Sequence, residues 1–420
     1  MSYEPVNQVH VWVAKDNADS KTHLKLGRLA IKDRRIYFEY DSTFLECGLE
    51  VSPFKLPLKA GVLVCEDRVF EGLFGVFNDS LPDGWGRLLL DRQVRRHGIA
   101  PEHLTPLDRL THVGEHGMGA LVYKPDVSDH ISHGEYINLD HLAQESMEAI
   151  EGEAEEVIAE LLDLSGSSCG ARPKVMVGVS QGDKRIIHGR CTLPVGYSHW
   201  MVKFASLNDL KDIGAVEYAY SLMARAAGVD VMPTALFPAK RGAGYFGVQR
   251  FDRQGESRLH VHTISGLLHA DHRLPSLDYE MLMRATMALT RDVAQVHKML
   301  RLAVFNILAH NRDDHSKNFS FLMSLTGTWT LAPAYDITFS GGPGGEHSTC
   351  IMGEGKNPGK EHIVKLAEKF SISSKDANRI ISEIRDAISK WPAFADEAGV
   401  SKASKKMIAN VIGQMYTHRE

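Results

Sequence analysis

The stretch from residue 310 to residue 336 constrains this chain most, because it sets three polar side chains at suggestive spacings. Asp313 is followed by Asn318 five residues later and by Asp336 eighteen residues after that. Phosphoryl transfer from a nucleotide uses one carboxylate to orient the attacking hydroxyl, and an amide oxygen and a second carboxylate to hold Mg²⁺. An Asp-x4-Asn spacing is common by chance, so a kinase interpretation needs a nucleotide-binding half elsewhere in the chain.

The sequence around these residues predicts a rigid support for them. Residues 279–309 have the apolar density of two buried helices that run directly into the motif. Residues 318–322 and 328–331 alternate like a short hairpin, which would bring Asn318 and Asp336 close together at its outer ends. A glycine-rich loop follows at 341–345, and the pattern from 360 to the end is helical with short turns.

The upstream half offers a loop suited to phosphate. Residues 165–174 are rich in Gly and Ser and precede a strand-like run at 175–179. Such a loop can direct backbone N–H groups at phosphates. It matches neither a Walker A sequence nor GxGxxG, and an ordinary flexible linker is an equal interpretation.

Two further strands are expected at 185–188 and 198–204, and the second contains Lys203. An unpaired charge in an apolar strand is costly, so Lys203 either reaches the surface or binds phosphate, as a strand lysine does in kinases. The helix expected at 214–228 places Glu217 in its first turns. Glu217 is a candidate partner for Lys203, or a surface glutamate favoured there by the helix dipole.

Strands at 228–236 and 245–253 complete this half, and the change to helical patterns after them is where a two-lobed kinase has its hinge. At the start of the chain, residues 8–15, 26–41 and 61–65 predict a β-rich unit, with a turn at Lys32-Asp33. Residues 107–164 look mainly helical.

The segment 77–87 contains Asp79, Asp83 and Arg87, which are polar enough for a metal or phosphate site. A tightly turned loop that packs on the following helix is the favoured interpretation. Ser80 or Asp83 is a candidate N-cap for that helix. Four histidines at 260, 262, 269 and 272 lack a zinc signature, so we expect solvated or hydrogen-bonded side chains.

Composition excludes several classes of protein. The five cysteines of the 420 residues are scattered without a Cys-x-x-Cys pair, which argues against a disulfide framework or zinc site and fits a reducing compartment. A net charge of -5 gives no global attraction to nucleic acid. No apolar run approaches the roughly 18 residues of a membrane span. We therefore expect a cytoplasmic protein that does not bind membranes.

Taken in order, segments 77–87, 169–174, 248–253, 311–318 and 331–336 resemble the signatures of the HipA family of bacterial serine/threonine kinases, the toxins of HipBA toxin–antitoxin systems. The resemblance covers nearly the full chain. It implies an α+β, two-lobed protein-kinase-like fold. Within that fold it implies a β-rich N-terminal subdomain (1–110), a kinase N-lobe-like region with phosphate loop and hinge (111–253), and an all-α C-terminal lobe (254–420).

The resemblance also implies roles for individual residues. Asp313 is the catalytic carboxylate, while its neighbour Asp314 lies one residue too close to Asn318 for the template. Asn318 and Asp336 would hold Mg²⁺, and Lys203 would contact the phosphates of ATP.

Further residues would contact the nucleotide. Gly170 and Ala171 belong to the implied phosphate loop, and His315 matches a histidine of the nucleotide site. Gln249 to Phe251 would hydrogen-bond adenine, largely through the backbone. Family members often have Glu where Gln249 stands, so a charge-dependent contact is not expected there.

The same resemblance assigns autophosphorylation to Ser167, an event linked to ejection of the phosphate loop and loss of activity. Ser165 and Ser168 are close enough to compete, and three serines selected only for flexibility are the simpler alternative.

These inferences predict an ATP- and Mg²⁺-dependent protein kinase whose target is a translation component such as an aminoacyl-tRNA synthetase. A small-molecule phosphotransferase of the aminoglycoside-kinase type shares the same core and is the main alternative. The resemblance implies a HipB-like helix-turn-helix antitoxin as partner, with operator DNA bound mainly through it. A metal hydrolase built on His310, Asp313, Asp314 and His315 is the least favoured possibility.

Overall fold

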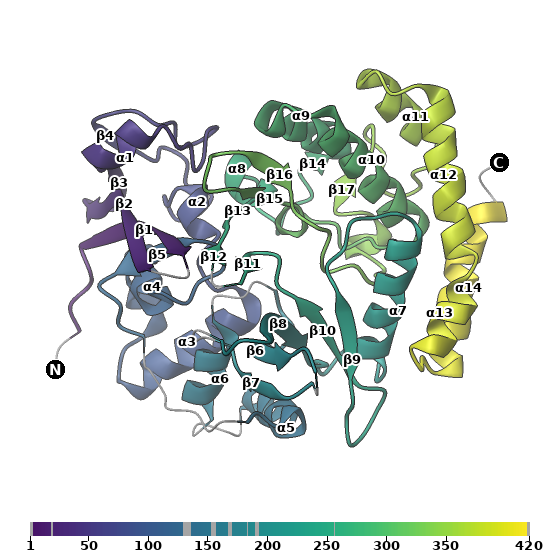
Figure 1. The fold of residues 1–420 in the computed structure, drawn as a ribbon, viewed down its shortest axis with the longest axis horizontal. Helices are drawn as coiled ribbons and strands as arrows, with labels where there is room; N and C mark the ends of the chain where they lie inside the picture. The colour runs from purple at the N-terminus through teal and green to yellow at the C-terminus, as the bar shows by residue number, and fades with distance from the viewer. Residues whose placement is uncertain are drawn as a thin grey trace.

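The computed structural model describes residues 3–17, 20–128, 136–152, 157–166, 170–182, 184–189, 193–255 and 257–417. Figure 1 shows three regions in chain order: an N-terminal sheet, a second sheet with its helices, and a region of helices and short strands that contains the C-terminus. No helix within these ranges is both long enough and apolar enough to cross a membrane.

The N-terminal region is built on an antiparallel sheet with strand order β4-β3-β2-β1-β5. Its strands are β1 (Gln8–Asn17), β2 (Ser20–Lys32), β3 (Arg35–Tyr40), β4 (Val62–Val64) and β5 (Leu121–Lys124). Alternate side chains of β3 are buried, as a sheet with one core-facing side requires. The turn between β2 and β3 lies at Asp33 and Arg34, both with positive φ, one residue beyond the predicted position.

The helices of this part of the chain are α1 (Ser42–Cys47), α2 (Gly75–Asn78), α3 (Gly84–Arg96), α4 (Pro106–Val113), α5 (Leu139–Glu151) and α6 (Ile158–Ser165). Helices α1 and α4 contact the N-terminal sheet, whereas α3, α5 and α6 pack into the apolar core of the second sheet. Thr105 and Asp108 form a capping box that begins α4. The region 107–164 is mainly helical as predicted, except that β5 interrupts it and pairs with β1. The proposed subdomain boundary near residue 110 stays a prediction.

The second sheet is antiparallel with strand order β7-β6-β8-β10-β9. Its strands are β6 (Lys174–Ser180), β7 (Ile186–His188), β8 (Tyr197–Lys203), β9 (Thr234–Phe237) and β10 (Tyr245–Gln249). Helix α7 (Ile213–Ala226) packs against β9 and β10. The strands predicted at 175–179, 185–188, 198–204 and 245–253 are confirmed in position, because each apolar run is flanked by turn residues. The strand predicted at 228–236 is confirmed only at its end, where β9 begins at Thr234.

The remaining region is mixed, so the prediction of an all-α C-terminal lobe is wrong. Strands β13 (His260–Thr263), β15 (Ser320–Met323) and β16 (Trp329–Leu331) form an antiparallel sheet, and β14 (Leu277–Asp278) pairs in parallel with β17 (Thr349–Cys350). The hairpin of β15 and β16 was predicted. Strand β13 is short and polar, and its partner lies far away in sequence, so local patterning could not reveal it.

The helices of this region follow the predicted order. They are α8 (Ile264–Leu268), α9 (Tyr279–Thr290), α10 (Val293–Leu308), α11 (Lys360–Lys369), α12 (Ser374–Ile388), α13 (Trp391–Glu397) and α14 (Lys402–Thr417). Asp278 and Asp292 cap the first turns of α9 and α10 by accepting from backbone N–H groups. One continuous apolar core joins the N-terminal sheet, α7 and these helices, which gives the polar loops between them a rigid support.

Candidate active site

A cavity of about 460 Å³ lies between the second sheet and the C-terminal region. Both regions line it, together with the N-terminal segment around Asp83. Nine of the residues singled out in the sequence line this one cavity: Gly170, Ala171, Lys203, Gln249, Phe251, Asp313, His315, Asn318 and Asp336. The candidate Ser167 lies outside the described residues.

Lys203, at the end of β8, is enclosed rather than directed at solvent. Its ammonium forms ion pairs with Glu217 of α7 and with Asp336, the latter at 2.6 Å. Burial alone would lower the pKa of Lys203, but the carboxylates of Asp336 and Glu217 outweigh burial and raise it. The suggested pairing of Lys203 with Glu217 is therefore confirmed, and Lys203 remains a cation at neutral pH.

Asp336 follows β16, has a positive φ and lines the cavity. The Lys203 ammonium holds the pKa of Asp336 well below its ordinary value, despite the opposing effect of burial. Lys174 and Arg172 act in the same direction. Asp336 is therefore a permanent carboxylate, as a ligand for a divalent cation must be.

The adjacent aspartates 313 and 314 have different environments. Asp314 is 1% exposed. It accepts hydrogen bonds from the Tyr279 hydroxyl at 2.7 Å and the Thr349 N–H at 3.1 Å, and it pairs with His347 at 3.0 Å. The carboxylate of Asp314 is therefore used to hold its own loop in place.

Asp313, in contrast, is exposed and lines the cavity. Partial burial raises its pKa, and the nearby negative charges of Asp336 and Asp314 add to this effect, although His315 opposes it. A carboxylate with a raised pKa is better suited to accept a proton than an unperturbed one. The geometry therefore favours Asp313 over Asp314 as the reactive carboxylate.

Asn318 ends the turn that begins after His315. Its side-chain amide N–H donates to the backbone carbonyl of Asp313 at 2.6 Å. The amide oxygen is the atom of this side chain that can coordinate a cation. Together with Asp336 it supplies the oxygen donors that Mg²⁺ prefers, so these residues fit the implied metal. His315 accepts from the Lys317 N–H at 3.3 Å.

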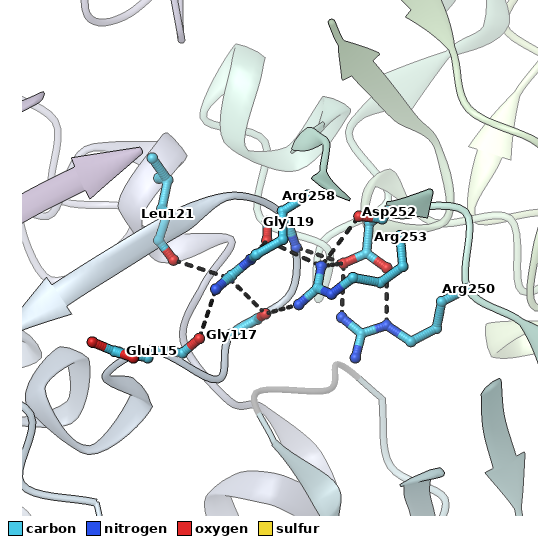
Figure 2. A network of polar contacts seen from close by, with 8 residues as sticks. All are labelled: Glu115, Gly117, Gly119, Leu121, Arg250, Asp252, Arg253 and Arg258. Carbon is cyan, nitrogen blue, oxygen red and sulfur yellow. Dashed lines mark hydrogen bonds and ion pairs between the residues drawn. The ribbon is translucent and has the colours of Figure 1, made fainter. Parts of the chain in front are cut away.

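The segment predicted to be the hinge, residues 249–253, follows β10 and is held by a buried charge network (Figure 2). Asp252 is fully buried and accepts from Arg250 at 2.9 and 2.7 Å, from Arg253 at 2.6 Å and from the Gly119 N–H at 2.8 Å. Burial opposes ionisation of Asp252, but the two guanidinium groups prevail and lower its pKa. The hinge is thus joined to an N-terminal loop.

That N-terminal loop, residues 115–121, is held through its backbone. Arg258 donates to the carbonyls of Glu115 at 2.7 Å, Gly117 at 3.2 Å and Gly119 at 2.8 Å (Figure 2). Met118, in the middle of the loop, lines the cavity. Local sequence patterns could not indicate this contact, because the arginines and the loop are more than 130 positions apart.

Several functional candidates were missed or undervalued in the sequence. Arg172 lines the cavity and pairs with Asp209 at 3.0 Å and with Glu217 at 3.4 Å. Lys174 and Lys317 also line it. The sequence feature that could have identified them is the position of these basic residues, next to the glycine-containing loop and next to Asn318.

The segment 77–87 does more than pack on a helix, which the sequence had favoured. Asp83 occupies the N-cap position of α3 without capping it, and its carboxylate lies instead against Lys317. Asp79 accepts from the Thr263 N–H and hydroxyl, both at 2.7 Å, and pairs with His262 at 2.6 Å. Arg87 is 3.8 Å from Asp91, on its own helix.

Three of the four histidines, His260, His262 and His269, are hydrogen-bonded as expected, whereas His272 lines the cavity. His260 bonds to the Val51 carbonyl at 2.8 Å, and His269 accepts from the Gly75 N–H at 3.0 Å. Of the three candidate serines, only Ser165 is described. It is fully buried, accepts from the Trp85 indole at 2.9 Å and donates to the Lys174 carbonyl at 3.1 Å.

Comparison with known families assigns both halves of the chain. The model for the HipA-like C-terminal domain matches residues 166–391, and the model for the HipA N-terminal domain matches residues 21–124. The chain belongs to the HipA family. The C-terminal match contains the nine cavity residues, so the HipA assignment rests on the region that carries the candidate site.

Two curated HipA-like relatives come from Sinorhizobium fredii. "Putative kinase Y4dM" is 25% identical over 237 residues, which cover 52% of this chain and 56% of that protein. "Putative kinase Y4mE" is 25% identical over 205 residues, which cover 45% of this chain and 42% of that protein. The matches thus span about half the length of these relatives.

A solved HipA structure shares the whole fold. The Shewanella oneidensis HipA chain, solved in complex with HipB and its operator DNA, aligns over 97% of this chain and 95% of its own length, with a TM-score of 0.68 and 18% identity. At this identity the likeness concerns the fold alone.

Proposed function

We propose that this HipA-family chain is an ATP- and Mg²⁺-dependent serine/threonine protein kinase. The observation that carries the proposal is the contact of Lys203 with both Glu217 and Asp336 inside one cavity. An active kinase site needs a strand lysine paired with a helix glutamate, and a metal-binding aspartate beside it. Three segments far apart in the sequence meet to make this arrangement.

In this proposal each side chain has a separate task. Lys203 contacts the ATP phosphates, Asn318 and Asp336 hold Mg²⁺, and Asp313 orients the substrate hydroxyl and accepts its proton. Because little covalent chemistry falls to the protein in phosphoryl transfer, the rate depends on positioning and charge neutralisation. The backbone of Gln249 to Phe251 would bind adenine, Gly170 and Ala171 would border the phosphates, and His315 would contact the nucleotide.

The proposal extends to a protein target in the cytoplasm and to autophosphorylation of Ser167. A translation component such as an aminoacyl-tRNA synthetase is the target class we infer from the family. A HipB-like antitoxin would bind this chain and connect it to operator DNA, as the three components occur together in the Shewanella complex. The burial of Ser165 and its two hydrogen bonds make it a poor phosphate acceptor.

The test is phosphoproteomics after expression of the intact chain, with Asp313→Gln as the inactive control. We expect phosphoserine on a cellular protein and on the 165–174 loop in the wild type only. An equal pattern in the Asp313→Gln variant would contradict the assignment. Radiolabel from ATP that appears only on an added aminoglycoside or sugar would favour the small-molecule phosphotransferase instead.

A further inference from the structure

The N-terminal residues Asp83, Gly84 and Trp85, here named the latch segment, contact the loop of residues 165–174 at Ser165 and at Gly170. Trp85 donates its backbone N–H to the Gly170 carbonyl at 3.0 Å and its indole N–H to Ser165 at 2.9 Å. Asp83 accepts from the Gly170 N–H. The latch segment therefore holds this loop at two points, Ser165 and Gly170.

Gly84 allows this close approach. It has a positive φ of 43°, and a Cβ atom on it would lie 2.5 Å from the Gly170 carbonyl oxygen and 2.8 Å from the Ala171 Cα. Any side chain at position 84 would push the two backbones apart, since real Cβ atoms do not approach backbone so closely. Glycine is required here by the contact itself as well as by the backbone conformation.

The carboxylate of Asp83 also reaches the catalytic loop. Lys317 donates to its second oxygen at 2.5 Å, with side-chain exposures of 6% for Lys317 and 21% for Asp83. Burial opposes ionisation of Asp83, but Lys317 and the Gly170 N–H together lower its pKa, so Asp83 is anionic at neutral pH. One side chain thus joins the implied phosphate loop to the segment between Asp313 and Asn318.

Lys317 is itself fixed from the other side. Its backbone carbonyl accepts from the Tyr335 hydroxyl at 2.5 Å, and Tyr335 directly precedes Asp336. The chain of contacts from the latch segment therefore passes through Lys317 to the residue that adjoins the candidate metal ligand. Within this chain of contacts, the bonds of the Asp83 carboxylate to Lys317 and to the Gly170 N–H are charge-assisted, and such bonds are stronger than neutral ones.

We propose that Asp83 is a positioning residue for nucleotide binding, and that the latch segment keeps Ser165 and Gly170 in register with the catalytic loop. The proposal rests on the proposed kinase function for its nucleotide, but the contacts themselves need none. A loop released from the latch segment would have to be ordered by ATP at the moment of binding. Because this ordering costs free energy, ATP would bind more weakly, whereas the rate of the chemical step would change little.

The first part of the test measures hydrogen exchange of the full chain without nucleotide, using overlapping peptides that isolate the Gly170 amide. Asp83→Ala and Gly84→Ala should each speed exchange at Gly170 by about tenfold or more, while the amides of β1 and β3 stay protected. Asp386→Ala, an exposed aspartate on α12, is the matched control and should change nothing. Unchanged protection at Gly170, or equal loss across the N-terminal sheet, would overturn the proposal.

The second part measures phosphorylation kinetics with varied ATP. In Asp83→Ala and Gly84→Ala the KM for ATP should rise about tenfold, with kcat lowered less than about threefold. A fall in kcat at unchanged KM would overturn the positioning role. If the wild-type chain transfers no phosphate, the proposed function fails, and the exchange experiment alone decides whether the latch segment holds the loop.

Discussion

Replacement of Asp252 by Asn should separate the hinge from the N-terminal loop. The carboxylate is fully buried and accepts from two guanidinium groups and from the Gly119 N–H. Asn has the same shape but no charge, and its NH2 group would face donors. Removing one partner of a buried ion pair costs about 3–5 kcal/mol, because the remaining charges lose their compensation.

The effect should be local, so hydrogen exchange is the appropriate assay. At about 1.4 kcal/mol per factor of ten, a loss of about 3 kcal/mol makes the amides of 115–121 and 250–258 exchange on the order of 100-fold faster. Asp386→Asn, which removes the same charge from an exposed site on α12, is the control. Acceleration below about threefold in Asp252→Asn would refute the view that this network joins hinge and loop.

Other consequences follow from single contacts. Glu217→Gln removes one of the two carboxylates on Lys203 and should lower kcat/KM for ATP by about 10–100-fold in steady-state assays, with an unchanged circular dichroism spectrum. Asp314→Asn should destabilise the chain by about 2–4 kcal/mol in urea unfolding because Tyr279, His347 and Thr349 lose a charged partner; a change below about 0.5 kcal/mol would contradict the structural role given to it. Burial lowers the pKa of His260 to about 4, so the unfolded chain binds the extra proton first as pH falls, and the free energy of unfolding should decrease from pH 6.5 to 4. His260→Gln should flatten that pH dependence.

The sequence was sufficient where information is local. The spacing of Asp313, Asn318 and Asp336 predicted residues that the structure brings to one cavity, because a short hairpin between the last two fixes their separation. Lys203 was recognisable as a charge inside an apolar strand, and its ion pair with Glu217 is as suggested. Helix and strand positions followed from periodicity and caps.

The sequence was insufficient where contacts join distant segments. Asp83 and Lys317 are 234 positions apart, so nothing near Asp83 indicated that its carboxylate would pair with a lysine of another region instead of capping α3. Strand β13 is defined by its pairing with β15 rather than by its own composition, and for that reason the C-terminal region was wrongly expected to be all-α. The requirement for glycine at position 84 likewise depends on a distant segment, because a Cβ atom there would lie 2.5 Å from the Gly170 carbonyl oxygen.

The most direct test of the central claim compares ATP binding with phosphate transfer in Asp313→Gln. If Asp313 acts on the substrate hydroxyl while Lys203, Asn318 and Asp336 hold the nucleotide, the variant should bind ATP–Mg²⁺ within about threefold of the wild type by calorimetry and lose at least about 1,000-fold in transfer rate. Transfer at the wild-type rate in Asp313→Gln would contradict the account.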